Sequence, residues 1–208
     1  MKKTILIVTS LVFCFLVTKV NAISLAQFYP WWDQLRWEYR TQEEDKVFTQ
    51  VVTCVVPKDS KKAGYDFYLD TKSVRHTKYY YQVEGNWIYL VKIDVKSNLF
   101  PIPLTFHVKP RMPAFPLNID DVNTLTWKWE GKYSSVLLKK SIKADFKLQR
   151  NVSMDTFQGA KTGLKLYATY TEEDTQDKLE AWHVKDLGLV YFSGPGHVKR
   201  LFKINNAK

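Results

Sequence analysis

The sequence contains only two cysteines among its 208 residues, and they cannot cross-link the finished protein. Cys14 lies in an N-terminal apolar stretch that we expect to be removed, so Cys54 remains alone and an intrachain disulfide is excluded. Cys54 stands in the apolar run 51–56, where a thiol is usually a small buried hydrophobic group. No activating partner is evident, which disfavours a nucleophilic role. The fold must therefore be held together by packing.

Motifs for metal, phosphate and nucleophilic chemistry are also missing. Each histidine is more than ten residues from the next, so none forms a local pair of metal ligands: His76, His107, His183 and His197. The sequence has no His-Glu-x-x-His, no Gly-x-Ser-x-Gly and no phosphate loop. We therefore predict no cofactor and no metal, and we expect that the protein is not an enzyme.

Three features offer weak alternatives to that prediction. The Gly-rich segment 193–197 lacks the lysine and the following helix of a phosphate cradle, and it predicts a hairpin turn. The acidic segment 172–174 lacks calcium-loop spacing and predicts a solvated loop. Glu130 and Glu180 lie in strand-like segments, so a hydrolase stays open as a third class if the two carboxylates meet across a cleft within roughly 10 Å.

The longest apolar run lies within the first 22 residues. Lys2 and Lys3 precede the uncharged stretch 4–18, which is followed by a small-residue ending at Ala22. This pattern is typical of a secretory signal peptide, and the apolar run is too short to span a bilayer comfortably. We predict cleavage after Ala22, a single β-rich domain over residues 23–208, and export to the periplasm or the extracellular space.

Acidic residues are outnumbered by basic ones. The full sequence has 31 Lys plus Arg against 21 Asp plus Glu, and loss of Lys2, Lys3 and Lys19 leaves a net charge of +7. The lysines are scattered along alternating segments, which favours a solvated basic surface. Contact with an anionic surface stays open as an alternative, whereas export argues against a nucleic-acid partner. The oligomeric state is not predicted.

Alternation of apolar and polar residues with a period of two is abundant. In residues 135–149 one face is apolar except at Lys140: Val136, Leu138, Ile142, Ala144, Phe146 and Leu148. Two further segments group Trp87, Tyr89, Val91, Ile93 and Val95 on one face, and Leu164, Leu166, Ala168 and Tyr170 on another. This pattern predicts half-buried antiparallel strands. We predict an all-β fold with minor α content, in which only residues 24–32 form a short helix.

Prolines and glycines divide these strands. Five of the eight prolines fall between residues 101 and 116, a density that predicts an edge strand or a crossing loop. The segment 84–86 predicts a hairpin turn, and Gly131 predicts a bend after residues 127–130. The composition on both sides of the proline-rich segment is alike, which favours one continuous sheet.

The opening of the predicted mature chain resembles the start of a broad group of exported bacterial β proteins of unknown function. Those proteins typically begin with Tyr-Pro, then a glycine, then Trp-x-Tyr. Here Pro30, Trp37 and Tyr39 stand at the usual separations, and Gln34 replaces the glycine.

Two later segments resemble the same group. Residues 182–190 are similar to its closing segment, an aromatic pair followed by a Gly-rich turn into Gly-Leu-Val, with His183 and Asp186 in place of the second aromatic and the first glycine. Residues 152–159 are similar to the strand-turn element that precedes its last hairpins. The resemblance implies a strongly curved antiparallel meander sheet, like the half-barrels of periplasmic lipoprotein-localisation carriers, and it implies no activity.

Aromatic residues make up 15% of the sequence, with seven tryptophans, which exceeds what a small core ordinarily needs. Adjacent residues of a strand point to opposite faces, so Tyr79 and Tyr81 share a face that excludes Tyr80. Trp127 and Trp129 likewise share one face. These side chains either fill the core of a thin sheet or line its concave face as a platform for a ligand.

Our leading hypothesis is a non-enzymatic exported binding protein whose curved sheet holds a lipid or other apolar ligand, with basic residues near the mouth meeting an anionic headgroup. The predicted ligand-binding residues are Trp37, Tyr79, Tyr81, Trp127 and Trp129. The alternative is a cell-surface module that recognises a protein or a polysaccharide through exposed aromatics and lysines. An empty apolar trough would favour the first hypothesis, and a filled concave face would favour the second.

Overall fold

The computed structural model describes residues 23–73, 76–96, 103–119 and 122–205, and strands account for most of them. The predicted signal peptide lies outside the described residues. The strands of the main sheet are β2 (Arg36–Glu43), β3 (Lys46–Val55), β4 (Phe67–Lys72), β5 (His76–Glu84), β6 (Trp87–Lys96), β7 (Leu104–Pro116), β9 (Thr124–Ser134), β10 (Lys139–Thr156), β11 (Gly159–Glu172), β12 (Thr175–Val184), β13 (Gly188–Gly194) and β14 (His197–Asn205). The short strands β1 (Ile23–Ser24) and β8 (Asn118–Ile119) pair with each other.

Helical structure in the described part of the chain is limited to the 3-10 turn η1 (Ala26–Phe28) and the single turn α1 (Ser60–Ala63). The turn η1 falls within the predicted helical segment 24–32, whereas α1 was not predicted. No helix among these residues is long and apolar enough to cross a membrane. The prediction of an all-β fold with minor α content is confirmed.

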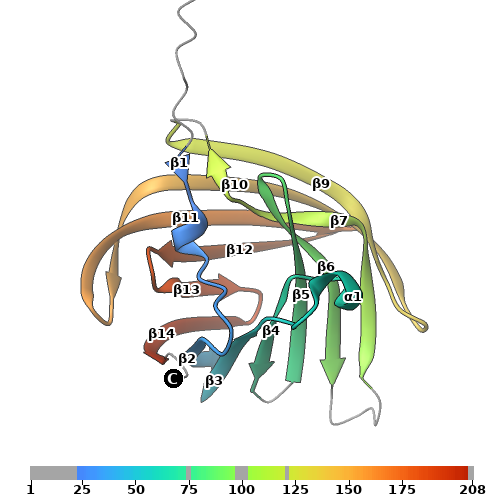
Figure 1. The fold of residues 1–208 in the computed structure, drawn as a ribbon, viewed down its shortest axis with the longest axis horizontal. Helices are drawn as coiled ribbons and strands as arrows, with labels where there is room; N and C mark the ends of the chain where they lie inside the picture. Colours follow the sequence, from blue (N-terminus) through green and yellow to red (C-terminus); the bar gives the residue numbers. More distant parts are fainter. Residues whose placement is uncertain (1–22, 74–75, 97–102, 120–121, 206–208) are drawn as a thin grey trace, which may run out of the picture.

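The main sheet is an antiparallel meander that closes on itself (Figure 1). Its twelve strands follow the order β10-β11-β12-β13-β14-β2-β3-β4-β5-β6-β7-β9, and β9 pairs again with β10. The predicted half-barrel therefore differs from the structure, which is a closed barrel. The closure depends on the pairing of β14 with β2, which joins the two ends of the described chain, whereas every other neighbouring pair in the barrel consists of strands that follow each other in the main sheet.

The alternation predicted for residues 135–149 holds in its second half only. Ala144, Phe146 and Leu148 of β10 point into the barrel and are buried, and they lie beside Ala168, Leu166 and other buried residues of β11. Val136 and Leu138 do not continue this face, because residues 135–138 form the turn between β9 and β10, where both side chains are exposed. A four-residue turn does not keep the strand period.

Bulges shift the predicted face of β6 as well. Its pairing with β7 is irregular between Ile88 and Tyr89 and again between Leu90 and Lys92. Ile88 and Leu90 are buried, so the prediction that grouped Trp87 and Tyr89 with Ile93 on one continuous face is wrong. A β-bulge adds one residue to a strand and thereby reverses the alternation beyond it.

The proline-rich segment forms β7, which pairs with β6 on one side at eight positions in two stretches. On its other side it pairs with β9 at only three positions, Val108 with Tyr133 and the residues flanking each of them. Beyond these, Pro110 and Pro113 have no amide to donate, and their carbonyls accept hydrogen bonds from the indoles of Trp129 and Trp127, each at 3.0 Å. We call this β7–β9 junction the seam. β7 therefore has the predicted character of an edge strand only on the side that faces β9.

Gly131 does not bend the chain, as was predicted, but lies inside β9 beneath a tryptophan ring. A Cβ at this position would lie 2.2 Å from the Trp129 ring. The residue is buried, and the indole occupies the space that a side chain would fill. The glycine is thus required by close packing.

The segment between β1 and β2 lies across the barrel, drawn in blue in Figure 1. It contacts residues from widely separated parts of the barrel. Its backbone hydrogen bonds run from the Leu25 amide to the Leu117 carbonyl, from the Asp186 amide to the Gln27 carbonyl, and from the Gln34 amide to the Cys54 carbonyl. Its aromatic rings pack as well, Tyr29 on Phe115 and Trp31 on Phe67. Leu25 and Leu35 are fully buried. This segment joins opposite walls and covers part of the interior.

Candidate ligand site inside the barrel

All five predicted ligand-binding aromatics belong to the inward-facing set. Trp37 and Trp129 are buried, while Tyr79, Tyr81 and Trp127 are half-buried and pack against the core. Each tryptophan is fixed through its indole N–H, which donates to a backbone carbonyl; for Trp37 this is Leu187, at 2.8 Å. Tyr81 stacks on Phe67 and Trp127 stacks on Phe146. The polar groups of all three tryptophans are thus paired with the backbone, whereas the two tyrosines retain free hydroxyl groups.

Four tyrosines from different walls converge inside the barrel: Tyr79 and Tyr81 of β5, Tyr133 of β9 and Tyr170 of β11. We call them the tyrosine cluster. In the strand order β5 and β11 lie on opposite sides of the barrel. Burial raises the pKa of each phenol, that of Tyr170 to about 12, and the neighbouring phenols add to the effect at Tyr81 and Tyr133. The hydroxyls therefore stay protonated at neutral pH.

The hydroxyl groups of this cluster are largely unused by the protein. Tyr133 donates a long hydrogen bond to the sulfur of Met112, at 3.5 Å. Tyr79, Tyr81 and Tyr170 form no side-chain hydrogen bond with any described residue, yet each is only half-buried. Polar groups in an interior are normally paired with protein or with water. These three phenols therefore offer donors and acceptors to a bound molecule or to water.

A lysine also faces inward. Lys199 of β14 is the cross-strand partner of Thr41 on β2 and of Phe192 on β13, and its residue row continues to Ala181, Leu166 and Leu148. Its ammonium lies 5.2 Å from the ring centre of Tyr39 and 5.0 Å from that of Phe192. No carboxylate among the described residues pairs with it. Burial lowers the pKa of Lys199 to about 8.

Polar atoms without partners surround this lysine. Thr41 Oγ1, Gln50 Oε1 and His183 Nδ1 are buried and have no hydrogen-bond partner in the described part of the chain. Thr41 is opposite Lys199, and Gln50 is opposite Tyr39 on the neighbouring strand. Burial lowers the pKa of His183 to about 3, and the charge of Lys199 contributes to this shift, so the imidazole is neutral. We call Lys199, Thr41 and His183 the cationic site.

Tyr29 connects the two groups of polar side chains. Its ring lies 4.5 Å from the imidazole of His183, measured between ring centres, and burial together with the nearby phenol of Tyr81 raises the pKa of Tyr29. Tyr29 belongs to the segment that covers the interior. The cationic site and the tyrosine cluster are thus linked by side chains within one interior.

The residues of the cationic site were not predicted from the sequence. Lys199 stands two positions before Leu201, which is buried, and the strand period places both on the same face. This alternation could have indicated that Lys199 faces the interior. Tyr170 was assigned to an inward face, but nothing in the sequence indicated that it would meet Tyr81 from across the barrel.

The opening segment 28–39 and the closing segment 182–190 contact each other. Trp37 of the opening segment binds the Leu187 carbonyl of the closing one, Tyr39 donates to Leu189 at 2.9 Å, and Gly188 packs against Pro30. Gln34 and Asp186, which replace glycines of the pattern, have φ angles of 63° and 62°. Both therefore adopt the left-handed conformation that glycine favours.

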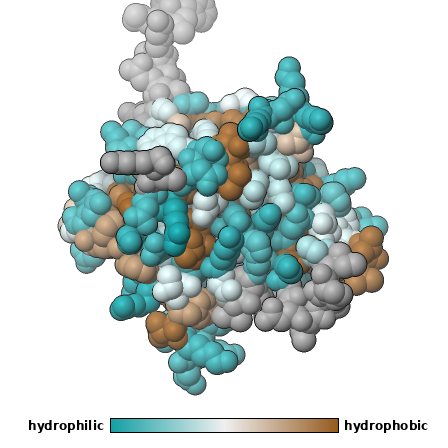
Figure 2. Space-filling model, turned by 60° about the horizontal axis from the view of Figure 1, so that its bottom comes forward, coloured by the Kyte–Doolittle hydropathy of each residue, from teal (hydrophilic) through white to brown (hydrophobic). Residues whose placement is uncertain are grey.

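The outer wall carries a separate row of aromatic and basic side chains. Cross-strand neighbours run from Lys165 through Trp182, Tyr191 and Arg200 to Arg40. The Lys165 ammonium lies 5.1 Å from the centre of the Trp182 ring, and the Arg200 guanidinium lies 5.5 Å from that of Tyr191. We call this row the outer ladder. The face of the molecule in Figure 2 is largely hydrophilic, with apolar patches between polar side chains.

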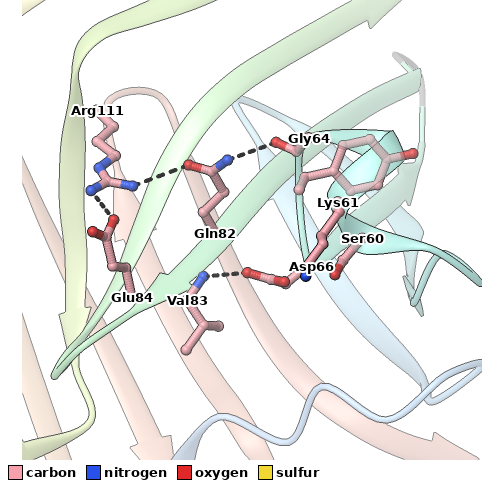
Figure 3. Close-up of a pocket in the computed structure, with 9 residues that line it drawn as sticks. Ser60, Lys61, Gly64, Asp66, Gln82, Val83, Glu84 and Arg111 are labelled. Carbon is pink, nitrogen blue, oxygen red and sulfur yellow. Dashed lines mark hydrogen bonds and ion pairs between the residues drawn. The ribbon is translucent and has the colours of Figure 1, made fainter.

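A polar surface hollow of about 310 Å³ lies beside α1 (Figure 3). Gln82 donates to the Gly64 carbonyl at 2.8 Å and accepts from Arg111 at 3.3 Å, and Arg111 also pairs with Glu84. Asp66 accepts from the Val83 amide at 2.7 Å. These bonds hold the loop after α1 against β5, so these polar groups stabilise the fold.

The hydrolase alternative is not supported by the positions of its carboxylates. Glu130 on β9 and Glu180 on β12 are separated by β10 and β11, which amounts to three strand spacings, or at least about 14 Å. Each binds a different lysine, Lys143 and Lys165. Cys54 is fully buried, and burial with the nearby Asp33 raises its pKa to about 12, so it is a protonated thiol.

No protein-family model and no curated protein sequence matches the chain. Two solved structures resemble it with 9% sequence identity and coverage of 86% of this chain. One is a candidate lipoprotein from Parabacteroides distasonis, with a TM-score of 0.40 over 98% of that chain. The other is a candidate exported protein with a YmcC-like fold from Bacteroides fragilis, with a TM-score of 0.33 over 99% of that chain. Likeness at this level carries no further conclusion.

Proposed function

We propose that this chain is an exported, non-enzymatic binding protein that holds a molecule with an apolar chain and a polar end group inside its barrel. The observation that carries the proposal is the tyrosine cluster: three partly accessible hydroxyls without protein partners, surrounded by aromatic and aliphatic walls. Ligand sites are typically apolar surfaces with a few placed polar groups. The export follows from the predicted signal peptide.

The width of the barrel supports the same proposal. An eight-stranded barrel is just wide enough to be filled by its own side chains or to hold one small ligand, and the diameter grows with strand number. This barrel has twelve strands and is therefore wider than one that its own side chains just fill. The segment from β1 to β2 and the inward-facing aromatics occupy part of that width.

The test compares binding of a neutral sixteen-carbon monoacylglycerol to the mature protein and to two matched variants. The inner variant, Tyr79→Phe with Tyr81→Phe and Tyr170→Phe, removes three interior hydroxyls without changing shape. The outer control, Tyr65→Phe with Tyr68→Phe and Tyr191→Phe, removes three outside. We expect saturable binding by native mass spectrometry and calorimetry, weakened about tenfold or more in the inner variant only. Absence of binding of any acyl lipid to delipidated protein would overturn the proposal.

The cell-surface module remains the second candidate, and the outer ladder favours it. Trp182 and Tyr191 with flanking cations are the residue types that anchor protein and sugar partners. Trp182→Ala with Tyr191→Ala would abolish attachment to a cell-wall fraction if this function holds. Under the carrier function the same variant would retain lipid binding.

A further inference from the structure

The function proposed above does not specify the polar end group of the ligand. The cationic site indicates which end group the barrel binds. We propose that Lys199, assisted by the Thr41 hydroxyl, binds the carboxylate of a long-chain fatty acid whose apolar chain extends toward the tyrosine cluster. This inference rests on the proposed function and names its ligand class.

The charge balance of the interior is the first argument. Lys199 lies between the ring faces of Tyr39 and Phe192, which attract a cation but do not neutralise it. Lys199 is half-buried, and no carboxylate of the described residues pairs with its ammonium. A ligand carboxylate would supply the one negative charge that this part of the interior lacks.

Hydrogen-bonding capacity is the second argument. Thr41 is 2% exposed and directly opposite Lys199 in the register, and its buried hydroxyl has no hydrogen-bond partner among the described residues. A carboxylate has two oxygens, so it can accept from the ammonium and the hydroxyl together. His183 is neutral, because its pKa is about 3, and therefore adds no competing charge.

The surrounding side chains favour an acyl chain over a small acid. Along the same inward row Lys199 is followed by Phe192, Ala181, Leu166 and Leu148, a continuous apolar strip. Phe115 packs against His183, Tyr29 packs against Phe115, and the phenol of Tyr29 is near that of Tyr81. A small acid such as acetate would leave this strip without contacts.

The experiment measures affinity for hexadecanoate and for hexadecanol, which differ only at the end group. The variants are Lys199→Met, which removes the charge at similar length, Lys199→Arg, which keeps it, and the exposed control Lys147→Met. We expect the native protein to prefer hexadecanoate, Lys199→Met to lose that preference by about tenfold or more, and Lys199→Arg and Lys147→Met to retain it. Circular dichroism of each variant confirms folding.

A pH series separates charge from shape. The titratable groups facing Lys199 are His183 and Tyr39, and neither changes charge between pH 6.5 and 9, because burial lowers the pKa of the first to about 3 and raises that of the second. Hexadecanoate affinity should therefore fall as the pH rises through about 8, where Lys199 loses its proton, and hexadecanol affinity should stay constant.

Each outcome is decisive. If native protein binds hexadecanol and monoacylglycerol but shows no preference for hexadecanoate, or if Lys199→Met leaves the preference unchanged, the carboxylate assignment is wrong while the proposed function stands. If no acyl compound binds, both are wrong. A preference for inorganic phosphate or acetate equal to that for hexadecanoate would also overturn the assignment.

A second inference rests on a different observation, the apolar tip formed by Val136, Leu137 and Leu138 between β9 and β10. Their exposed fractions are 94%, 72% and 43%. The turn is held by Ser135, whose amide donates to the Leu138 carbonyl at 2.7 Å and whose hydroxyl oxygen accepts from the Leu137 and Leu138 amides. Three consecutive apolar side chains are therefore held outward by a well-bonded turn.

We propose that this tip inserts into the interface of an anionic lipid membrane. Exposed Lys132 and Lys139 lie on the two strands that flank it, and the sequence as a whole is basic, so the surroundings complement negative headgroups. Apolar side chains with flanking lysines are the combination that binds membrane interfaces. The proposal does not depend on the interior ligand.

The test is co-sedimentation with phosphatidylcholine vesicles that contain or lack 30% phosphatidylglycerol, a fraction chosen as roughly that of an anionic membrane. The variant Val136→Ser with Leu137→Ser and Leu138→Ser should bind at least about tenfold more weakly, because it loses most of the inserted apolar area. The control is Val47→Ser, on another exposed hairpin. Equal binding by variant and native protein, or a native dimer that the variant converts to monomer without any vesicle binding, would overturn the proposal.

Discussion

Single residues in the barrel interior carry polar groups that the fold does not satisfy. Lys199 lacks a counter-ion, and the Thr41 hydroxyl and His183 Nδ1 lack hydrogen bonds among the described residues. An unpaired buried polar atom costs roughly 1–3 kcal/mol relative to a paired one, which applies to Thr41 Oγ1 and His183 Nδ1. The fold gains no stability from these unpaired atoms, which is consistent with the binding role proposed above.

His183 should make the stability of the fold depend on pH. Its folded pKa of about 3 lies below the usual 6.5, so between these values the unfolded chain binds more protons and the free energy of unfolding falls as the pH falls. The slope from this residue is about 1.4 kcal/mol per pH unit. His183→Phe, which restores an aromatic ring beside Tyr29, should remove that slope. Urea unfolding of both proteins at pH 7, 6 and 5, values that span roughly the range in which a free histidine titrates, tests this. The same pH dependence of the free energy of unfolding in the native protein and in His183→Phe would contradict it.

Two residues with left-handed backbones should be improved by glycine. Gln34→Gly and Asp186→Gly relieve a steric cost of about 1–2 kcal/mol and add backbone entropy to the unfolded chain, so each should stabilise the protein by about 0.5–1 kcal/mol. The gain should be larger at Gln34, because aspartate tolerates this conformation better. The control Gln34→Ala removes the side chain but keeps the strain. Thermal unfolding that ranks alanine above glycine at position 34 would refute the argument.

At the scale of elements, the seam is where the barrel closes with the fewest backbone hydrogen bonds. β7 and β9 pair over three residues, whereas β10 and β11 pair over twelve. The prolines of β7 remove amides that a longer ladder needs, and two indole N–H groups supply donors instead. Side chains thus replace main-chain pairing along half of this junction.

Removing one of those donors should weaken the seam measurably. Trp129→Phe keeps a ring but leaves the Pro110 carbonyl without its donor, which should lower the free energy of unfolding by about 1–3 kcal/mol. Trp32→Phe is the matched control, because Trp32 is 57% exposed and such changes are usually within about 0.5 kcal/mol. Urea unfolding of both variants gives the comparison. Equal effects would show that the indole hydrogen bond contributes nothing.

The alternation of β10 and β11 made most of the inward face predictable, because a period of two needs only local sequence. Val136 and Leu138 were misassigned because a turn breaks the period without any glycine or proline to mark it. The face of β6 was misassigned because a bulge is set by pairing with β7. The inward placement of Trp127 and Trp129 followed from the period, whereas the cationic site depends on β14 pairing with β2, which local patterns do not specify.

For the molecule as a whole, closure joins the two ends of the described chain. β14 pairs with β2, and Trp37 and Tyr39 near the beginning donate to Leu187 and Leu189 near the end. The opening segment also spans the interior. The proposed ligand would therefore contact walls that belong to both halves of the chain, and the seam is the junction whose opening disturbs the fewest backbone bonds.

A cross-link across the seam tests that view of the whole barrel. Lys109 and Lys132 are register partners on β7 and β9, and antiparallel partners have Cα separations that suit a disulfide. In the oxidised Lys109→Cys, Lys132→Cys variant, amides of residues 107–109 should exchange hydrogen more slowly than in the reduced form, because local opening of the seam is blocked. The control pair, Ser153→Cys with Thr162→Cys, links β10 to β11. Its oxidation should leave seam exchange unchanged if the seam opens by itself. Equal slowing by both cross-links would mean instead that the seam exchanges only when the whole barrel unfolds.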